Sequence, residues 1–240
     1  MMNEGYIKKA FTPEELECGV WNNWDGRGNI LTKRLINIIK DKLDFSQVKC
    51  ILDIGSRDGL QSMEFNRWFP EAKIYAFEPI KSSFNFIVNL TKDIDNIEAL
   101  NYAITSYNGK IKFYEVYNGN VGASSLLKTS GHPRTQHWQQ REIEVDCINL
   151  EDWLDKKEIN SVDIAWVDVQ GAEKIVFESF GKYLNDVKVI ATEVGVVPLY
   201  EGAITKELLD KQLTNHICIS SQLEPSGTES DTIYIRRDLL

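Results

Sequence analysis

Cysteine is scarce in this sequence, and its cysteines are not arranged as a binding site. The chain has four among 240 residues, and no two form a Cys-x-x-Cys pair or stand near a histidine at metal-ligand spacing. This pattern argues against a disulfide-stabilised scaffold and a zinc motif. We expect the thiols to be reduced and buried, where they pack as small apolar side chains.

Positive charge is also in short supply. The 27 Lys and Arg residues are outnumbered by 36 Asp and Glu residues, which gives a formal net charge of -9. Because proteins that bind nucleic acids neutralise phosphates with clustered basic side chains, this balance disfavours DNA or RNA as a partner. We therefore expect the substrate to be a small molecule, a glycan or a protein, and of these a small-molecule or glycan acceptor is favoured.

Long apolar runs are absent as well. None approaches the roughly 18–20 residues that a membrane-spanning helix requires, and the first residues do not form a basic segment followed by an apolar one. The sequence therefore predicts no membrane span and a cytoplasmic location. No linker, internal repeat or low-complexity tract divides the chain. We expect residues 1–240 to form one domain, and a homo-oligomer is compatible with this organisation.

The sequence does contain a regular alternation of helical patterns and short apolar runs. Apolar residues recur at helical spacing over residues 30–43, whereas residues 50–54 form an apolar run that is stopped by glycine. Similar pairs continue to the end of the chain, and successive β-α units imply a parallel sheet. The predicted fold class is α/β: a Rossmann-like, mostly parallel sheet of six to seven strands, flanked by helices and with an antiparallel C-terminal strand.

The predicted domain has three parts. Residues 1–45 form a helical lead-in, and residues 46–240 form the core. A loop of about residues 118–142 is inserted in this core, because that stretch is polar and lacks periodicity. Trp21 and Trp24 in the lead-in are expected to pack against the core rather than line a substrate mouth.

The first predicted strand ends in Asp53-Ile54-Gly55-Ser56-Arg57-Asp58-Gly59. Ligands of open parallel sheets bind at the carboxyl ends of the strands, where glycine lets the backbone come close and the next helix offers free N–H groups. A dinucleotide fingerprint would have glycine at positions 53 and 58. Both are aspartates, which suit a cationic amino-acid group better than a pyrophosphate. The turn therefore predicts S-adenosylmethionine (SAM) as the cofactor.

A further acidic residue supports an adenosine ligand. Glu78 ends the second strand, where a carboxylate can accept hydrogen bonds from both ribose hydroxyls. Enzymes that bind NAD use an acid in the same way, so a nucleotide-dependent oxidoreductase is an alternative that only the first turn argues against. The predicted cofactor-binding residues all follow strands and are Asp53, Gly55, Ser56, Asp58, Gly59, Glu78, Pro79, Tyr102, Ala103 and Asp168.

Four stretches together resemble the FkbM-type methyltransferases, a family of class I SAM-dependent enzymes. They are residues 51–59, 76–79, 164–173 and 192–194. The resemblance implies the class I methyltransferase fold and O-methylation of a hydroxyl on a sugar, a glycan or a small natural product. Gln170 departs from the family, which usually has Glu there, so no metal or base role is carried over to it. This departure leaves a non-catalytic SAM-binding module as a second alternative.

The strand ends also supply candidates for catalysis, since a base must remove the proton of the acceptor hydroxyl. Asp168 is the first candidate, and its alternative roles are to orient the cofactor or to cap the next helix. Glu193 ends the neighbouring strand and would anchor the acceptor hydroxyl. The two carboxylates are also able to hold a divalent cation, a role that we do not favour, and no metal ligand is predicted.

The inserted loop adds further candidates. His132 and His137 are possible bases, because histidine titrates near neutral pH, although both would also suit a solvated loop. Arg134 and Arg141 would bind an anionic acceptor, and Trp138 would stack on a sugar ring, but loop solubility explains the two arginines equally well.

Overall fold

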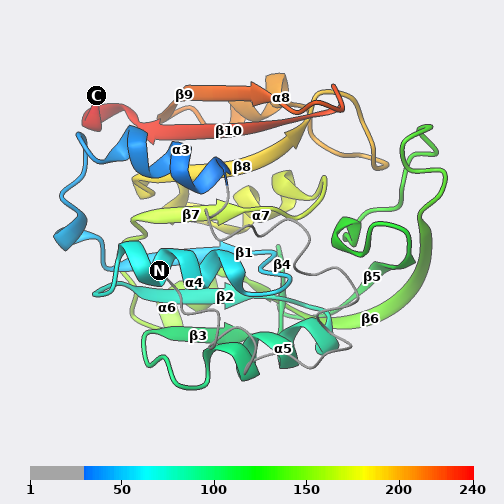
Figure 1. Cartoon of the computed structure of the whole chain (residues 1–240), viewed down its shortest axis with the longest axis horizontal. Coiled ribbons are helices and arrows are strands. Elements are labelled where there is room, and N and C mark those ends of the chain that lie inside the picture. The colour runs from blue at the N-terminus through cyan, green and yellow to red at the C-terminus, as the bar shows by residue number, and fades with distance from the viewer. Residues whose placement is uncertain (1–29) are drawn as a thin grey trace.

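The computed structural model describes residues 30–240, which are built around a seven-stranded sheet (Figure 1). Its strands are β1 (Cys50–Ile54), β2 (Lys73–Phe77), β3 (Ile97–Leu100), β7 (Ile164–Val167), β8 (Val189–Gly195), β9 (His216–Leu223) and β10 (Glu229–Arg236). Their order across the sheet is β3-β2-β1-β7-β8-β10-β9. The first five strands of this order run parallel, and β10 is antiparallel to both of its neighbours. The predicted Rossmann-like α/β fold with an antiparallel C-terminal strand is confirmed.

Helices cover both faces of this sheet. One face carries α3 (Ile30–Ile39), α4 (Leu60–Trp68) and α5 (Lys81–Thr91), and the other carries α6 (Leu150–Lys156), α7 (Glu173–Ser179) and α8 (Lys206–Gln212). Ile51 packs in the apolar cluster of the first face and Leu52 in that of the second, and neither side chain is exposed. Because side chains alternate along a strand, burial on both faces produces the continuous apolar runs of the sequence.

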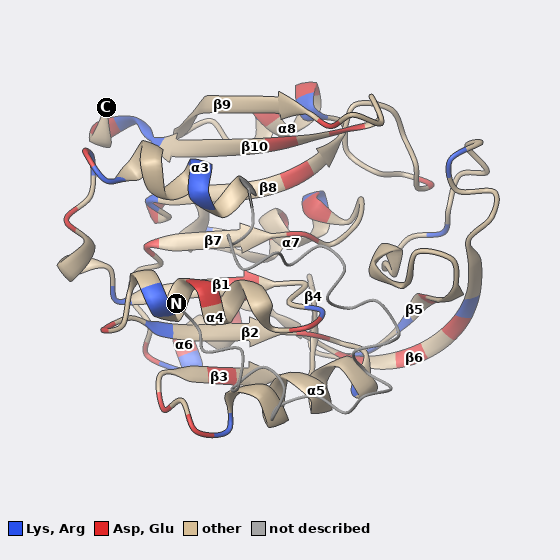
Figure 2. Ribbon diagram, in the orientation of Figure 1, with Lys and Arg blue, Asp and Glu red and all other residues tan. Residues whose placement is uncertain are grey.

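A second, three-stranded sheet follows β3. It contains β4 (Ala103–Thr105), β5 (Gly109–Asn118) and β6 (Gln139–Asn149) in the order β4-β6-β5. β5 and β6 form a long antiparallel hairpin that curves away from the main sheet (Figure 1). Phe113 packs in a small apolar cluster of this sheet. Charged residues of both signs mark the hairpin (Figure 2), and they include the ion pairs Lys110–Glu144 and Lys112–Glu142, each 2.8 Å long.

The structure corrects several predicted boundaries. The inserted loop is shorter than 118–142, because β6 already begins at Gln139. Residues 139–141 are polar and lie at the far end of the hairpin, where no apolar alternation is needed. Residues 173–186 form two helices rather than one, α7 and the 3-10 helix η3 (Gly181–Asp186), since Gly181 adopts φ +51°. The short strand β4 was not predicted.

The lead-in is only partly described. The predicted helix over residues 30–43 is present as α3 and ends at Ile39. Trp21 and Trp24 lie outside the described residues. Among residues 30–240, no helix combines the length and the apolar character that crossing a membrane would require.

Candidate active site

A cavity of about 700 Å³ lies at the carboxyl ends of β1, β2 and β7, between these strands and the β5–β6 hairpin. This volume falls within the range of small-molecule sites. Seven of the ten predicted cofactor residues line it: Gly55, Asp58, Glu78, Pro79, Tyr102, Ala103 and Asp168. The other three, Asp53, Ser56 and Gly59, do not line the cavity but belong to the same turn.

The turn after β1 brings the backbone against the end of β7. Gly55 has φ +87°, and a Cβ atom at this position would lie 1.9 Å from the carbonyl oxygen of Asp168. The N–H groups of Gly55 and Ser56 both donate to the carbonyl of Phe77, at 3.0 and 2.9 Å. The turn is therefore fixed against the ends of both β2 and β7, and only glycine fits at its first position.

Asp53 lies behind this turn rather than in the cavity. Its side chain is fully buried, and one carboxylate oxygen accepts hydrogen bonds from the hydroxyls of Ser56 (2.7 Å) and Ser62 (2.5 Å). The other oxygen has no hydrogen-bond partner among the described residues. Burial raises the pKa of Asp53 to about 6, against the lowering effect of the two hydroxyls. Asp53 thus ties the turn to the first residues of α4.

Glu78 is held by the backbone at the end of β2. Its Oε2 accepts the N–H of Arg57 at 2.9 Å, and its Oε1 accepts the N–H of Ile80 at 2.7 Å. Burial raises the pKa of Glu78 to about 8, and these two N–H groups oppose the shift. Each oxygen retains one lone pair, so the carboxylate is able to accept two further hydrogen bonds, as the two hydroxyls of a ribose would offer.

Asp58 and Arg57 form the rim of the cavity beside Glu78. Arg57 adopts φ +50°, which is uncommon for a residue with a side chain, and its guanidinium pairs with Asp58 at 2.7 Å. Asp58 also accepts the N–H of Leu60 at 3.2 Å, at the start of α4. Arg57 lines the cavity, although it was not among the predicted site residues.

Asp168 ends β7 and is linked to Glu193 through Gln170. The Nε2 atom of Gln170 donates to Asp168 Oδ1 at 2.8 Å and to Glu193 Oε2 at 3.0 Å. Asp168 and Gln170 line the cavity, whereas Glu193 lies behind them. Burial raises the pKa of Asp168, against the effect of the Gln170 amide. Burial and the neighbouring carboxylates raise the pKa of Glu193 as well. The structure therefore joins the two carboxylates that the sequence placed on neighbouring strand ends.

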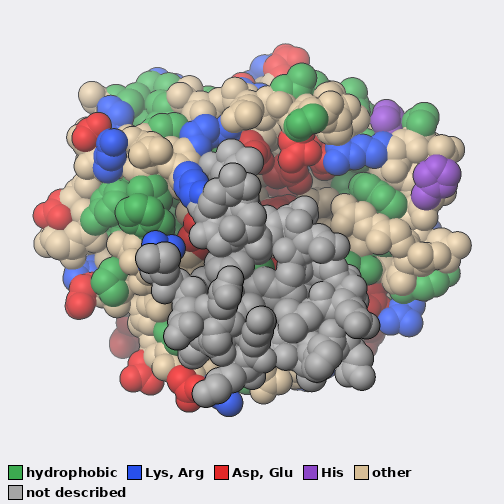
Figure 3. Space-filling view, viewed as in Figure 1, with side chains coloured by type: hydrophobic (Ala, Val, Ile, Leu, Met, Phe, Trp, Pro, Cys, Tyr) green, Lys and Arg blue, Asp and Glu red, His purple; other side chains and the backbone are tan. Residues whose placement is uncertain are grey.

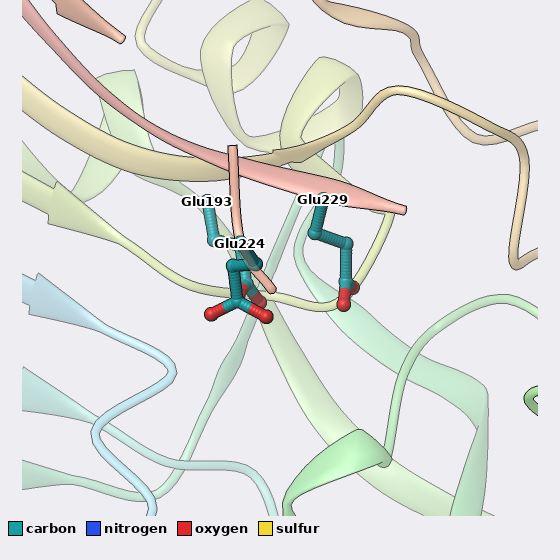
Figure 4. A group of neighbouring side chains, drawn as sticks. All are labelled: Glu193, Glu224 and Glu229. Carbon is teal, nitrogen blue, oxygen red and sulfur yellow. The ribbon is translucent and has the colours of Figure 1, made fainter. Parts of the chain in front are cut away.

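Glu193 also belongs to an acidic group with Glu224 and Glu229, whose carboxyl groups turn toward a common space (Figure 4). One oxygen from each lies within 4.8 Å of the others. Acidic side chains gather in a hollow on this side of the molecule, next to basic ones (Figure 3). Arg134 from the inserted loop pairs with Glu229 at 2.7 Å and with Glu224 at 3.7 Å. Its predicted contact with an anionic acceptor is thus replaced by contacts within the protein.

The histidines of the inserted loop lie away from the cavity. His132 accepts the backbone N–H of Arg134 at 3.2 Å through Nδ1, and His137 is exposed. Neither residue lines the cavity. Arg141 does line it, and its guanidinium pairs with Glu115 at 2.7 Å. Of the histidines and arginines predicted for the loop, Arg141 is therefore the one that lines the cavity.

The wall formed by the hairpin was missed by sequence reasoning. Phe113, Glu115 and Tyr117 line the cavity from β5. They occupy every second position of one strand, which was the available signal. No sequence pattern pointed to Tyr200, which lies in the segment between β8 and α8. Its hydroxyl donates to the amide oxygen of Gln170 at 3.0 Å. Trp138 packs on Tyr200 with 6.3 Å between ring centroids.

The cavity has the chemistry of a site for SAM. Four carboxylates line it, those of Asp58, Glu78, Glu115 and Asp168. Asp58 and Glu115 pair with Arg57 and Arg141, so Glu78 and Asp168 are left to attract a cationic ligand. The lone pairs of Glu78 suit an adenosine group, and Gly55 lines the cavity where its turn packs against the end of β7. Among residues 30–240, Glu193, Glu224 and Glu229 are the group with the spacing of metal ligands.

Comparisons with known proteins agree with this geometry. The family model described as the methyltransferase FkbM domain matches residues 53–219. The chain is 28% identical over 191 residues to the 2-O-methyltransferase NoeI of Sinorhizobium fredii (strain NBRC 101917 / NGR234), covering 76% of this chain and 77% of the relative. It is 27% identical over 146 residues to Methyltransferase 1 of Beauveria bassiana (strain ARSEF 2860), covering 55% and 59%. A fibrillarin/NOP5P complex shares the fold, with a TM-score of 0.50, 12% identity and coverage of 86% and 83%.

Proposed function

This chain belongs to the FkbM methyltransferase family, and from that premise we propose that it methylates a hydroxyl oxygen of a sugar, a glycan or a small natural product. Membership makes it a SAM-dependent methyltransferase with the Rossmann-like class I fold. It also favours this activity over the oxidoreductase alternative, in line with the aspartate at position 58, which lines the cavity. Oxygen as the methylated atom is supported by the relative that is named a 2-O-methyltransferase.

The cavity residues divide between the two ends of SAM. Glu78 would accept hydrogen bonds from the ribose hydroxyls, and Tyr102 and Ala103 would lie beside the adenine. Asp168 would attract the cationic end. Bound SAM supplies an electrophilic methyl carbon, whose bond to sulfur breaks with the electron pair remaining on sulfur.

Asp168 carries the proposal, because it lines the same cavity as Glu78 and the turn at Gly55. As the acceptor oxygen bonds to the methyl carbon, the hydroxyl proton passes to the carboxylate of Asp168. The raised pKa of Asp168 makes it a stronger base than an ordinary aspartate. Since His132 and His137 do not line the cavity, the proton transfer is assigned to Asp168 rather than to them.

Methyl transfer is tested with SAM that carries an isotopically labelled methyl group and a fractionated cell extract. The label is expected in a product that survives mild alkali, as a methyl ether does. Asp168→Asn should lower the initial rate by about 10²–10⁴-fold, while the affinity for S-adenosylhomocysteine, measured by calorimetry, stays within a few-fold. Asp146→Asn, at an exposed position of β6, is the matched control and should keep the rate.

Three results would overturn the proposal. Release of the label as methanol in mild alkali would indicate a carboxyl ester, and therefore a different acceptor group. An unchanged rate for Asp168→Asn would remove Asp168 as the base. Binding of S-adenosylhomocysteine without methyl transfer to any fraction would favour the non-catalytic module instead.

A further inference from the structure

Gln170 occupies the junction between the ends of β7 and β8. Both N–H bonds of its amide are used, one toward Asp168 at 2.8 Å and one toward Glu193 at 3.0 Å. The amide oxygen lies 3.0 Å from the hydroxyl of Tyr200. Because both neighbours of Nε2 are carboxylates, only this orientation of the amide satisfies the network. The side chain therefore connects two acids to one another and to the segment after β8.

The backbone of Gln170 is held in an uncommon conformation. Its φ is +54°, in the left-handed region, which is unfavourable for a residue with a side chain. The next residue, Gly171, has φ +94°, and a Cβ atom there would lie 2.9 Å from the ring of Tyr200. Such conformations persist where the surrounding structure fixes them. Here the packing on Tyr200 fixes a turn that directs the amide between the two carboxylates.

Two carboxylates that share one donor would repel each other without it. Three kinds of group relieve such repulsion: a proton, a divalent cation, or an N–H donor placed between the oxygens. We propose that the Gln170 amide takes the place of a divalent cation between Asp168 and Glu193, so that this enzyme holds its strand-end carboxylates together without a metal. The inference rests on the proposed function only in treating Asp168 as part of the active site.

The surroundings of Glu193 make this assignment testable. One carboxylate oxygen of Glu224 and one of Glu229 lie within 4.8 Å of a carboxylate oxygen of Glu193. Gln170→Glu (Q170E) would remove both amide donors and add one more carboxylate to this group. Clustered carboxylate oxygens are the ligands that Mg²⁺ and Mn²⁺ prefer. The variant should therefore gain the cation site that the wild-type amide makes unnecessary.

Binding of Mn²⁺ to the full chain measures this directly, because the electron paramagnetic resonance signal of free Mn²⁺ is lost on binding. Q170E is expected to bind Mn²⁺ at least about tenfold more tightly than the wild type, since affinity grows with the number of charged ligands. Gln47→Glu adds the same charge at an exposed position of the 3-10 helix η1 (Phe45–Gln47) and should bind as the wild type does. A chelator should lower the melting temperature of Mn²⁺-loaded Q170E and leave that of the wild type unchanged.

A second variant separates the inference from a folding defect. Q170E combined with Glu193→Gln returns one amide to the pair, with the two groups exchanged, and should bind Mn²⁺ as weakly as the wild type. Restored folding in this double variant would support the inference even if Q170E alone does not fold. The inference fails if a chelator destabilises the wild type, or if folded Q170E binds Mn²⁺ no more tightly than Gln47→Glu. These measurements use neither SAM nor an acceptor, so they stand apart from the test of methyl transfer.

Discussion

Replacing Gly55 with alanine should force apart the ends of β1 and β7. The new Cβ atom would lie 1.9 Å from the carbonyl oxygen of Asp168, so one of the two strand ends must move by more than about 1 Å to restore an ordinary contact. The left-handed φ of +87° adds a conformational cost of about 1 kcal/mol. With an overpacking cost of about 1–3 kcal/mol, the expected loss of unfolding free energy is about 2–4 kcal/mol.

Thermal unfolding measures this loss. For a chain of this size, 1 kcal/mol corresponds to a shift of about 2–4 °C, so the melting temperature of Gly55→Ala should fall by about 4–16 °C. Gly131→Ala is the matched control, since Gly131 has φ +79° but no atom within 4 Å of an added Cβ. It should lose only the conformational cost, about 2–4 °C.

Ligand binding distinguishes a local effect on the site from a general loss of stability. S-adenosylhomocysteine should raise the melting temperature of the wild type and of Gly131→Ala, because a ligand that binds only the native state stabilises it. It should have little effect on Gly55→Ala, whose turn no longer fits against β7. Equal losses of stability in the two variants, with equal stabilisation by the ligand, would refute the close approach at Gly55.

Three further predictions concern single groups of the site. Glu78→Gln should weaken binding of S-adenosylhomocysteine by about tenfold or more in calorimetry above the Glu78 pKa of about 8, because a hydrogen bond to a charged group contributes about 1.5–3 kcal/mol; an unchanged affinity would exclude Glu78 from the site. The pKa of Asp53 is raised from 3.8 to about 6, so the native state binds more protons than the unfolded state between these values, and stability falls as pH rises through this window. Asp53→Asn should flatten that fall in melting curves recorded between about pH 4 and 7, and an unaltered slope would contradict the shift. Replacing His132 and His137 together by Gln should leave the methyl-transfer rate unchanged, whereas a drop of about tenfold or more would return the role of base to the loop.

The local features of the site were readable in the sequence. The turn from Asp53 to Gly59, the acid at Glu78 and the aspartate that ends β7 all follow short apolar runs, and the carboxyl ends of parallel strands meet at one edge of a sheet. Strand β1 (Cys50–Ile54) has the bounds of the apolar run over residues 50–54, because burial on both faces leaves a continuous apolar run that glycine ends sharply.

The direction of individual side chains was harder to predict. Asp53 was expected to contact the cofactor, but it lies behind the turn and accepts hydrogen bonds from Ser56 and Ser62. The alternation of side chains along β1 places Asp53 on the same face as Ile51, beneath the helices α3 and α4. The alternation of side chains along β1 could be read from the sequence. The face of the sheet on which Asp53 lies could not, because all five residues of β1 are buried.

Contacts between distant segments were decided by the tertiary structure alone. The sequence placed Asp168 and Glu193 on neighbouring strand ends, but the Gln170 amide joins them only because a left-handed turn directs it there. Tyr200 fixes that turn from a segment without secondary structure, and the β5–β6 hairpin brings Tyr117 to the cavity. Local patterns specify how each strand ends, since they depend on neighbouring residues. The shape of the acceptor side depends on packing between segments that are far apart in the chain, and no spacing within the sequence encodes it.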